Sequence, residues 1–267
     1  MENVITIIPY YNNNITDIKK TFSSFSEDCN ILVIDDGSKP SFSEIVGDTF
    51  SAYLNLEIIT LNENRGIENA LKTALSLVVD KYEYIARLDI GDKSDLTRFA
   101  KQKKFLDDNR DYVIVGTWAK FVNEHGELQF LYKTPIEDER IRKLMYKNNM
   151  FVHPSVMFRS SAIKKSGNYS DRFKACEDYD LFFRLLSVGK GYNIPEGLTV
   201  YEVNFNSISS KKRQLQVINR IKIICVNFKF LRYGFYPYYG LIRSVVMLLI
   251  GRKQSSFINK IIKGSKI

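Results

Sequence analysis

"YIARLDIGDKSDLTRF", residues 84–99, carries the clearest structural signal in the sequence. The segment opens with an apolar extended run that ends on Asp89, and a second acid, Asp92, follows three residues later. A short apolar run that stops at an acid is typical of a buried strand in a parallel sheet, where ligands bind beyond the carboxyl ends of the strands. Gly91, between the two acids, contributes no side chain. We therefore expect a strand with a polar site at its end.

Short apolar runs alternate with helix-like segments on both sides of this stretch. The expected strands are 4–9, 31–36, 56–61 and 84–89, and the expected helices are 16–25, 67–79 and 94–108. This alternation indicates βαβ units, and so an α/β fold with a mostly parallel sheet and helices on both faces. From residue 112 the pattern predicts a hairpin to 132, a helix near 137–146, a strand at 151–158 and a helix at 178–189.

Composition and charge separate a catalytic domain from a basic tail. The chain has 267 residues and is 45% hydrophobic and 26% charged, which suits one large domain with an appendage. All 30 Asp and Glu residues lie at or before position 202, whereas 13 of the 39 Lys and Arg residues follow it. We expect a domain over 1–205 and a basic helical region over 206–267. A nucleic-acid enzyme would spread its basic residues along a binding face, so nucleic acid is not an expected partner.

The termini and the cysteines indicate a cytoplasmic protein. The sequence "MENVITIIPYYNN" has no basic region and only a short apolar run, so it predicts a first strand and not a signal peptide. Cys29, Cys176 and Cys225 are odd in number, widely spaced and match no metal or redox pattern, which suits a reducing compartment.

Three expected strands end in polar residues, at 9–12, 35–38 and 89–92. Such ends meet at one edge of a parallel sheet, and converging acids there suit a ribose hydroxyl, a nucleobase N–H or a hard divalent cation. Turn chemistry is the alternative at any single strand end, because Asp often begins turns. The chain has neither the glycine-rich dinucleotide fingerprint after its first strand nor a phosphate-binding P-loop.

Six motifs occur in an order that resembles glycosyltransferase family 2, the inverting enzymes of GT-A fold. They are "IIPYYNN", "ILVIDDGSKP", "NENRGIENALKTAL", "IARLDIGD", "HPSVMFR" and "CEDYDLFFRL", and the resemblance covers about residues 3–210. It implies a nucleotide-sugar half over about 1–110 and an acceptor half over about 111–205. It also implies a nucleoside pocket lined by residues of the first two strand ends, namely Pro9, Tyr11, Asp35 and Asp36. Arg65 then approaches the base or phosphates, and Asp89 opens the family's Asp-x-Asp pattern.

The same resemblance implies that Asp178 is the catalytic base. An acceptor hydroxyl attacks the anomeric carbon, and a carboxylate within hydrogen-bond reach must take its proton. Glu177 stands beside Asp178, and the alternative for this pair is that it charge-matches the following helix. His153 either faces the diphosphate or acceptor, or is a hydrogen-bonded structural residue.

Two departures from the family pattern bear on metal binding. Gly91 stands where relatives commonly carry a metal-ligating carboxylate, and Asn204 falls near the position of a His in many of them. We expect an Mg²⁺ or Mn²⁺ site built on Asp89 and Asp92. The alternatives are that side-chain cations carry more of the diphosphate charge, or that the chain is a catalytically silent GT-A subunit of a polysaccharide assembly complex.

The basic tail predicts the acceptor. Helical spacing places apolar residues on one face and cations on the other, with Phe257, Ile258, Ile261 and Ile262 on the apolar side. Such a helix can lie on an anionic membrane surface. Packing on the domain or on a second subunit, as in a homodimer, is the alternative. We therefore expect a peripheral protein at the cytoplasmic face of the cell membrane. By resemblance to bacterial O-antigen and capsule transferases, it would transfer a sugar, from a UDP-sugar in preference, to a polyprenyl-diphosphate-linked saccharide.

Overall fold

Helices and strands alternate along the first half of the chain as the sequence predicts. The computed structural model describes residues 3–53, 55–123, 125–202, 213–229 and 232–249. The strands are β1 (Val4–Tyr10), β2 (Asn30–Asp35), β3 (Leu56–Thr60), β4 (Tyr84–Arg87), β5 (Lys93–Ser94), β6 (Tyr112–Val122), β7 (Leu128–Tyr132), β8 (Met157–Arg159) and β9 (Lys190–Glu202). The helices are α1 (Ile15–Phe22), α2 (Phe42–Val46), α3 (Ile67–Val78), α4 (Arg98–Asp108), α5 (Asp138–Met145), α6 (Ser160–Ser166), α7 (Glu177–Val188), α9 (Arg213–Val226) and α10 (Tyr236–Leu249), with 3-10 turns η1 (Gly47–Phe50), η2 (His153–Ser155) and η3 (Asp171–Phe173).

In this part of the chain the nine strands form one sheet in the order β3-β2-β1-β4-β8-β6-β9-β5, and β7 pairs with β6. The strands β3, β2, β1 and β4 are parallel, which confirms the expected βαβ units. β8 runs antiparallel to both β4 and β6, so the second half of the sheet is mixed. The register pairs Tyr10 with Asp35 and Ile7 with Arg87. The carboxyl ends of β1, β2 and β4 therefore lie at one edge.

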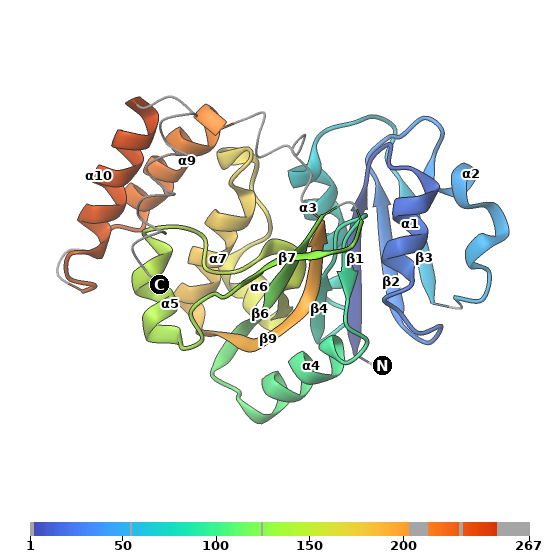
Figure 1. Ribbon diagram of the computed structural model, residues 1–267, viewed down its shortest axis with the longest axis horizontal. Coiled ribbons are helices and arrows are strands. Elements are labelled where there is room, and N and C mark those ends of the chain that lie inside the picture. Colours follow the sequence, from blue (N-terminus) through green and yellow to red (C-terminus); the bar gives the residue numbers. More distant parts are fainter. Residues whose placement is uncertain (1–2, 54, 124, 203–212, 230–231, 250–267) are drawn as a thin grey trace.

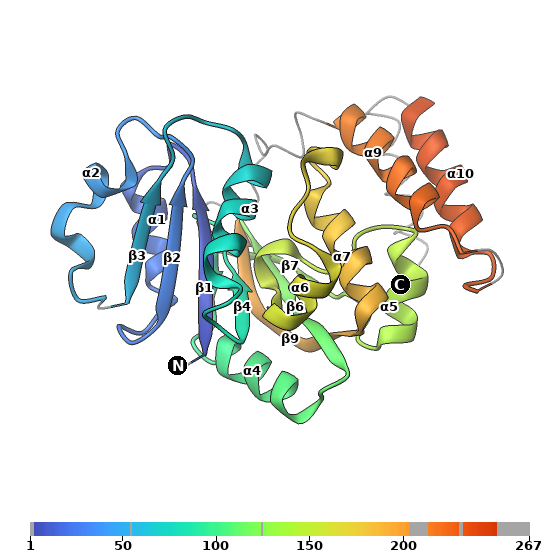
Figure 2. The same cartoon turned by 180° about the vertical axis from the view of Figure 1, so that it is seen from behind.

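Both faces of the sheet are buried, because alternate residues of each strand enter different cores. Ile5 and Ile7 of β1 join a core with residues of α3, α6 and α7, whereas Val4 and Ile8 join a core with residues of α1, α2 and α4. Figures 1 and 2 show these two helical layers from opposite sides. This period of two explains why the strands read as continuous apolar runs.

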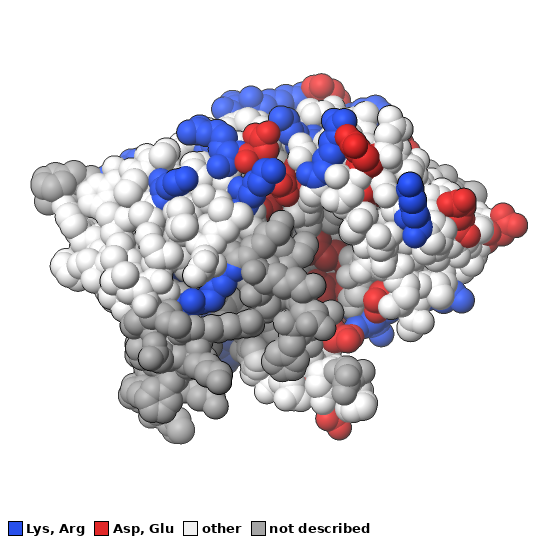
Figure 3. Space-filling view, turned by 90° about the horizontal axis from the view of Figure 1, so that it is seen from above, with Lys and Arg blue, Asp and Glu red and all other residues white. Residues whose placement is uncertain are grey.

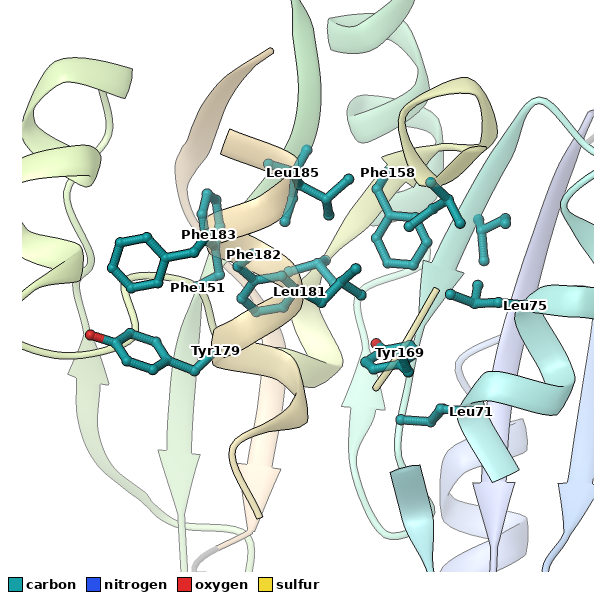
Figure 4. Close-up of a cluster of buried hydrophobic side chains, with 14 of the residues drawn as sticks. Leu71, Leu75, Phe151, Phe158, Tyr169, Tyr179, Leu181, Phe182, Phe183 and Leu185 are labelled. Atoms are coloured by element: carbon teal, nitrogen blue, oxygen red, sulfur yellow. The ribbon is translucent and has the colours of Figure 1, made fainter. Parts of the chain in front are cut away.

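The core that contains residues of α3 and α7 is rich in aromatic residues. Phe182 and Leu185 of α7 and Leu71 and Leu75 of α3 belong to one buried cluster, together with Tyr169 (Figure 4). Phe151 packs edge-on against Phe182, with ring centroids 5.4 Å apart. This packing fixes the first turn of α7, where Glu177 and Asp178 lie.

Three segments differ from the sequence expectation. The strand predicted over 151–158 is the 3-10 turn η2 followed by the short strand β8. The helix predicted from 94 begins at Arg98, because residues 93–94 pair with β9 as strand β5. The sequence did not predict β9. This strand pairs in parallel with β6 over most of its length, with several register shifts.

In the part of the basic tail that the structure describes, α9 and α10 lie side by side, at the opposite end of the molecule from α2 (Figures 1 and 2). Ile223 and Ile224 of α9 are fully buried in the same core as α7. α9 thus packs on the domain, which is the alternative that the sequence left open. The expected membrane-binding face at 257–262 and Asn204 lie outside the described residues. Among the helices that the structure describes, none is both long and apolar enough to cross a membrane.

Candidate active site

Two acids at the end of β2, Asp35 and Asp36, form hydrogen bonds with different neighbouring loops. Asp35 is fully buried, and its carboxylate accepts hydrogen bonds from the backbone N–H groups of Ser38 (2.9 Å) and Phe42 (2.8 Å). Asp36 follows, and its backbone N–H donates to the carbonyl of Tyr10 (2.9 Å). The Asp35 carboxylate therefore holds the loop that leads to α2, and the backbone of Asp36 links the ends of β1 and β2.

The Asp36 carboxylate holds the loop that precedes α3. It accepts hydrogen bonds from the backbone N–H groups of Arg65 (3.0 Å) and Gly66 (2.8 Å). Gly66 has a φ of +94°, and an added Cβ would come within 2.9 Å of the Glu68 carboxylate, so only glycine fits this approach. Burial raises the pKa of Asp36. The Arg65 side chain is exposed and pairs with Glu63 at the rim.

The other two residues expected to line a nucleoside pocket lie at the end of β1. Pro9 is half-buried, and Tyr11, just beyond the strand, is 48% exposed. The backbone N–H of Asn12 donates to Ser38 Oγ (3.0 Å), which joins this rim to the loop after β2. An exposed aromatic ring just beyond β1 offers a face on which a nucleobase can stack.

Arg87, at the end of β4, holds the first acid of the opening motif. Its guanidinium is fully buried, and Nη2 donates to Asp89 Oδ1 at 2.6 Å. The Nε and Nη1 atoms of Arg87 have no hydrogen-bond partner among the described atoms. Asp89 remains 31% exposed, so it presents one side to the site and the other to Arg87.

Asp92 and Gly91 form the rest of this strand end. Asp92 is 6% exposed, and its Oδ2 has no hydrogen-bond partner within the described structure. Burial, and next the charge of Asp89, raise the pKa of Asp92 well above its usual value. Gly91 has a φ of +95°, and an added Cβ would meet no described atom within 4 Å. There is open space where a third carboxylate would stand.

The second acidic pair lies at the first turn of α7. Asp178 Oδ2 accepts a hydrogen bond from Asn149 Nδ2 (2.8 Å), and Oδ1 accepts one from the backbone N–H of Tyr179 (2.7 Å). Burial raises the pKa of Asp178. Burial and the charge of Asp178 raise the pKa of Glu177 to about 8, and Glu177 Oε2 has no hydrogen-bond partner in the described part of the chain.

His153 lies near this pair as a neutral side chain. Its Nε2 shares a hydrogen bond of 2.8 Å with the Tyr169 hydroxyl. Burial, and next the charge of Arg87, lower the pKa of His153 well below its usual value. Its hydrogen bond matches the structural interpretation that the sequence left open.

The charges of several of these groups act on one another. The charge of Arg87 opposes the rise that burial causes in the pKa of Asp178 and of Asp92. The charge of Glu68 adds to the effect of burial and raises the pKa of both Asp36 and Glu177. Figure 3 shows acidic side chains recessed in a hollow of this surface. The ends of β2 and β4 and the start of α7 thus supply the carboxylates of the candidate site.

Two residues of this site were missed by the sequence analysis. Arg87 had a signal, because a charged residue within an apolar strand needs a partner, and Asp89 is two positions away. Asn149 had none, because its contact with Asp178 joins positions 29 residues apart that only the fold brings together.

The raised pKa of Glu177 predicts a pH-dependent stability. A carboxyl whose pKa rises from 4.5 to about 8 on folding contributes stability that is present at acidic pH and is lost as the pH rises through that value. Calorimetry measures the Tm of the wild type and of Glu177→Gln at pH 5 and at pH 8. We expect the wild type to lose more of its Tm than the variant between these two pH values, because the glutamine side chain does not ionise. The exposed Glu57→Gln is the control. A Tm difference that did not vary with pH would contradict the assignment.

Comparisons with known proteins identify the family of the chain. A family model described as glycosyl transferase family 2 matches residues 5–167. The UDP-Gal:alpha-D-GlcNAc-diphosphoundecaprenol beta-1,3-galactosyltransferase of Escherichia coli is 27% identical over 83% of this chain and 79% of that protein. The O-antigen biosynthesis glycosyltransferase WbnJ of Escherichia coli is 33% identical over 64% of this chain, and the match spans 63% of WbnJ.

The fold is also that of a solved glycosyltransferase structure. S. aureus TarS 1-349 in complex with UDP-GlcNAc superimposes with a TM-score of 0.67 at 16% identity, covering 92% of this chain and 72% of that one. The fold is GT-A, as the sequence predicts. The family model covers more than half of the residues. The chain therefore belongs to glycosyl transferase family 2, and it is a glycosyltransferase.

Proposed function

We propose that the chain transfers a sugar, with inversion, from a UDP-sugar to a hydroxyl of a lipid-linked saccharide during bacterial surface polysaccharide synthesis. The observation that carries this proposal is Asp178, a carboxylate held by Asn149 and by a backbone N–H, whose pKa responds to the charge of Arg87, the partner of Asp89. Such a group is oriented and close to the place where a donor's diphosphate would lie. The two Escherichia coli relatives support the pathway, because their names give a diphosphoundecaprenol acceptor and O-antigen synthesis.

In the proposed reaction Asp178 takes the proton of the acceptor hydroxyl. The hydroxyl oxygen forms a bond to the anomeric carbon from the face opposite the nucleotide, while the bond from that carbon to the diphosphate oxygen breaks. UDP leaves with the bonding electron pair, and Asp178 ends protonated. Burial raises the pKa of Asp178, which makes its carboxylate a stronger base than an exposed one.

The donor would lie across the ends of the parallel strands. We assign the nucleoside to Pro9, Tyr11 and Asp36, with Arg65 at the rim and Asp35 supporting the loop from below. Asp89 would contact the ribose and the diphosphate, since it is the partly exposed acid at the end of β4. His153 and Glu177 would border the acceptor side of the transferred sugar.

The residues present fit a divalent cation that the donor helps to hold. Within the described ranges no three His, Cys, Asp or Glu side chains are grouped to hold a metal. Asp89 and Asp92 nevertheless offer two carboxylates. Asp92 Oδ2 lacks a partner, and the space beside Gly91 is open. Mg²⁺ is commonly held by one or two carboxylates together with substrate phosphates. Asp89 and Asp92 would hold the ion, which would neutralise charge on the leaving diphosphate.

A donor panel tests the proposal. UDP-, GDP- and dTDP-sugars are mixed with the full chain, with Mn²⁺ or with EDTA. The Tm shift and slow nucleotide release are then measured. We expect a UDP-sugar to raise the Tm and to release UDP, and Mn²⁺ to strengthen both effects. Failure of every nucleotide sugar to bind would overturn the proposal. Binding without turnover, even with lipid-linked saccharide extracts present, would favour the silent subunit, an alternative that the missing third carboxylate supports.

A further inference from the structure

A second cavity lies outside the acidic hollow, between the β6–β7 hairpin, α5 and α10. Its volume is about 750 Å³, which is within the range of small-molecule sites. Four cationic side chains line it, namely Lys133, Arg140, Lys147 and Arg243, against one acid, Glu137. The site proposed for the donor does not use any of these residues.

Among the described residues, the charges of these four cations are not balanced by ion pairs. None of the four forms an ion pair with a carboxylate in the part of the chain that the structure describes. Arg243 Nη1 donates to the backbone carbonyl of Lys147 at 3.1 Å, which holds two of them at one wall. Burial, and next the charge of Arg220, lower the pKa of Arg243, as expected where cations are crowded. An anion with more than one charge fits this lining.

Aromatic rings supply the rest of the recognition surface. Trp118, Tyr132 and Tyr239 line the same cavity. Trp118 Nε1 donates to the Thr134 carbonyl at 2.9 Å, which fixes the indole in place. Rigid rings beside cations suit a ligand that joins a sugar ring to a phosphate group, because the ring contacts the aromatic faces and the phosphate contacts the cations.

The cavity is connected to the proposed base by two consecutive residues. Asn148 lines the cavity, and Asn149 donates the hydrogen bond to Asp178 Oδ2. Arg220 of α9 fixes Asn148 through a hydrogen bond of 2.7 Å from Nη2 to Oδ1. A ligand in the cavity would therefore contact the residue next to the one that holds Asp178.

α10 extends the cavity with an apolar strip. Tyr239 and Arg243 are one helical turn apart and line the cavity. At 100° per residue, the exposed side chains of Ile242, Val246 and Leu249 lie within about 80° of Tyr239 on the same helix. They are 59%, 43% and 80% exposed. The cationic cavity thus continues into an uncovered hydrocarbon surface.

We propose that this cavity binds the prenyl-diphosphate end of the acceptor. The cations hold the diphosphate, the aromatic rings contact the first sugar, and the α10 strip contacts the first isoprene units. The assignment rests on the proposed function, because it names where the lipid-linked acceptor binds. A free diphosphate shares the charged part of this chemistry, and the apolar strip is what favours a lipid-linked source.

The single tryptophan gives a direct readout, because Trp118 lies in the cavity wall. Geranyl diphosphate, inorganic pyrophosphate and geraniol are titrated into the full chain, first without UDP and then with UDP at a concentration that just saturates the donor site. We expect geranyl diphosphate to change the Trp118 emission saturably, with at least about tenfold higher affinity than pyrophosphate, and geraniol to have no effect. Equal affinities for the two diphosphates would overturn the lipid-linked assignment. No response, or a response that UDP abolishes, would overturn the site.

Variants on α5 and just beyond it locate the binding. Arg140→Gln and Lys147→Gln should each weaken geranyl diphosphate binding by about tenfold, because each removes one charge-assisted contact. Lys143→Gln is the matched control, since Lys143 is on α5 but pairs with Glu139 and does not line the cavity. Unchanged affinity in folded Arg140→Gln and Lys147→Gln would contradict the assignment. The readout needs no turnover, so failure of the transfer reaction and failure of this inference give different results.

Discussion

Asp178→Asn should lower the transfer rate by about a thousandfold, while the affinity for the donor nucleotide stays within about twofold. Asparagine keeps the shape of the side chain and can keep a hydrogen bond with Asn149, but it cannot accept the proton of the acceptor hydroxyl. The donor's nucleoside is assigned to the strand ends, so its binding does not depend on this group. Rates are measured in single turnovers, and affinity is measured by calorimetry.

Asp171→Asn is the matched control, because Asp171 is an exposed acid in the turn before α7. It should leave both the rate and the affinity unchanged. A near-normal rate in Asp178→Asn would remove the base assignment. Equal losses of rate and nucleotide affinity would instead show that Asp178 supports the structure of the donor site.

Arg87→Met should lower the free energy of unfolding by about 1 to 3 kcal/mol at pH 7, because it removes a buried cation that compensates the partly exposed Asp89 and neighbouring acids. The Arg87 guanidinium is fully buried and donates to Asp89 at 2.6 Å. Its charge also favours the ionised forms of Asp178 and Asp92. Urea unfolding at constant pH measures the change.

A double-mutant cycle with Asp89→Asn isolates the pair. If Arg87 stabilises the protein by compensating Asp89, Arg87→Met should cost at least about 1 kcal/mol less in the Asp89→Asn background. Asp89→Asn alone leaves the buried guanidinium without its carboxylate, so it should also destabilise. Additive effects in the double variant would show that Arg87 acts mainly through packing.

The sequence predicted the first half of the fold, where the local residue pattern and the rules for parallel sheets lead to the same arrangement of strands. β1, β2 and β4 are apolar runs that stop at polar residues, and parallel strands must place such ends at one edge. That rule alone is sufficient to bring Asp36 and Asp89 to the same edge of the sheet. The hairpin of β6 and β7 was also predicted, because alternating strands flank a short glycine-containing turn.

The parts that were missed depend on long-range contacts. β9 contains Pro195 and Gly197, which interrupt a strand pattern, and it is accommodated by register shifts against β6. The hydrogen bond between Asn149 and Asp178 needs the aromatic core that fixes α7. The second cavity joins the hairpin and α5 to α10, which follows them by about a hundred residues, so no local motif could indicate it.

The stereochemistry of the released sugar tests the central claim most directly. A single displacement assisted by Asp178 replaces the nucleotide from the opposite face of the anomeric carbon, and water can act as a slow acceptor. An α-linked UDP-sugar identified in the donor panel is hydrolysed by the full chain, and proton NMR records the anomeric signal before mutarotation. We predict that the β-anomer appears first and that Asp178→Asn abolishes its formation. Initial release of the α-anomer would contradict the account.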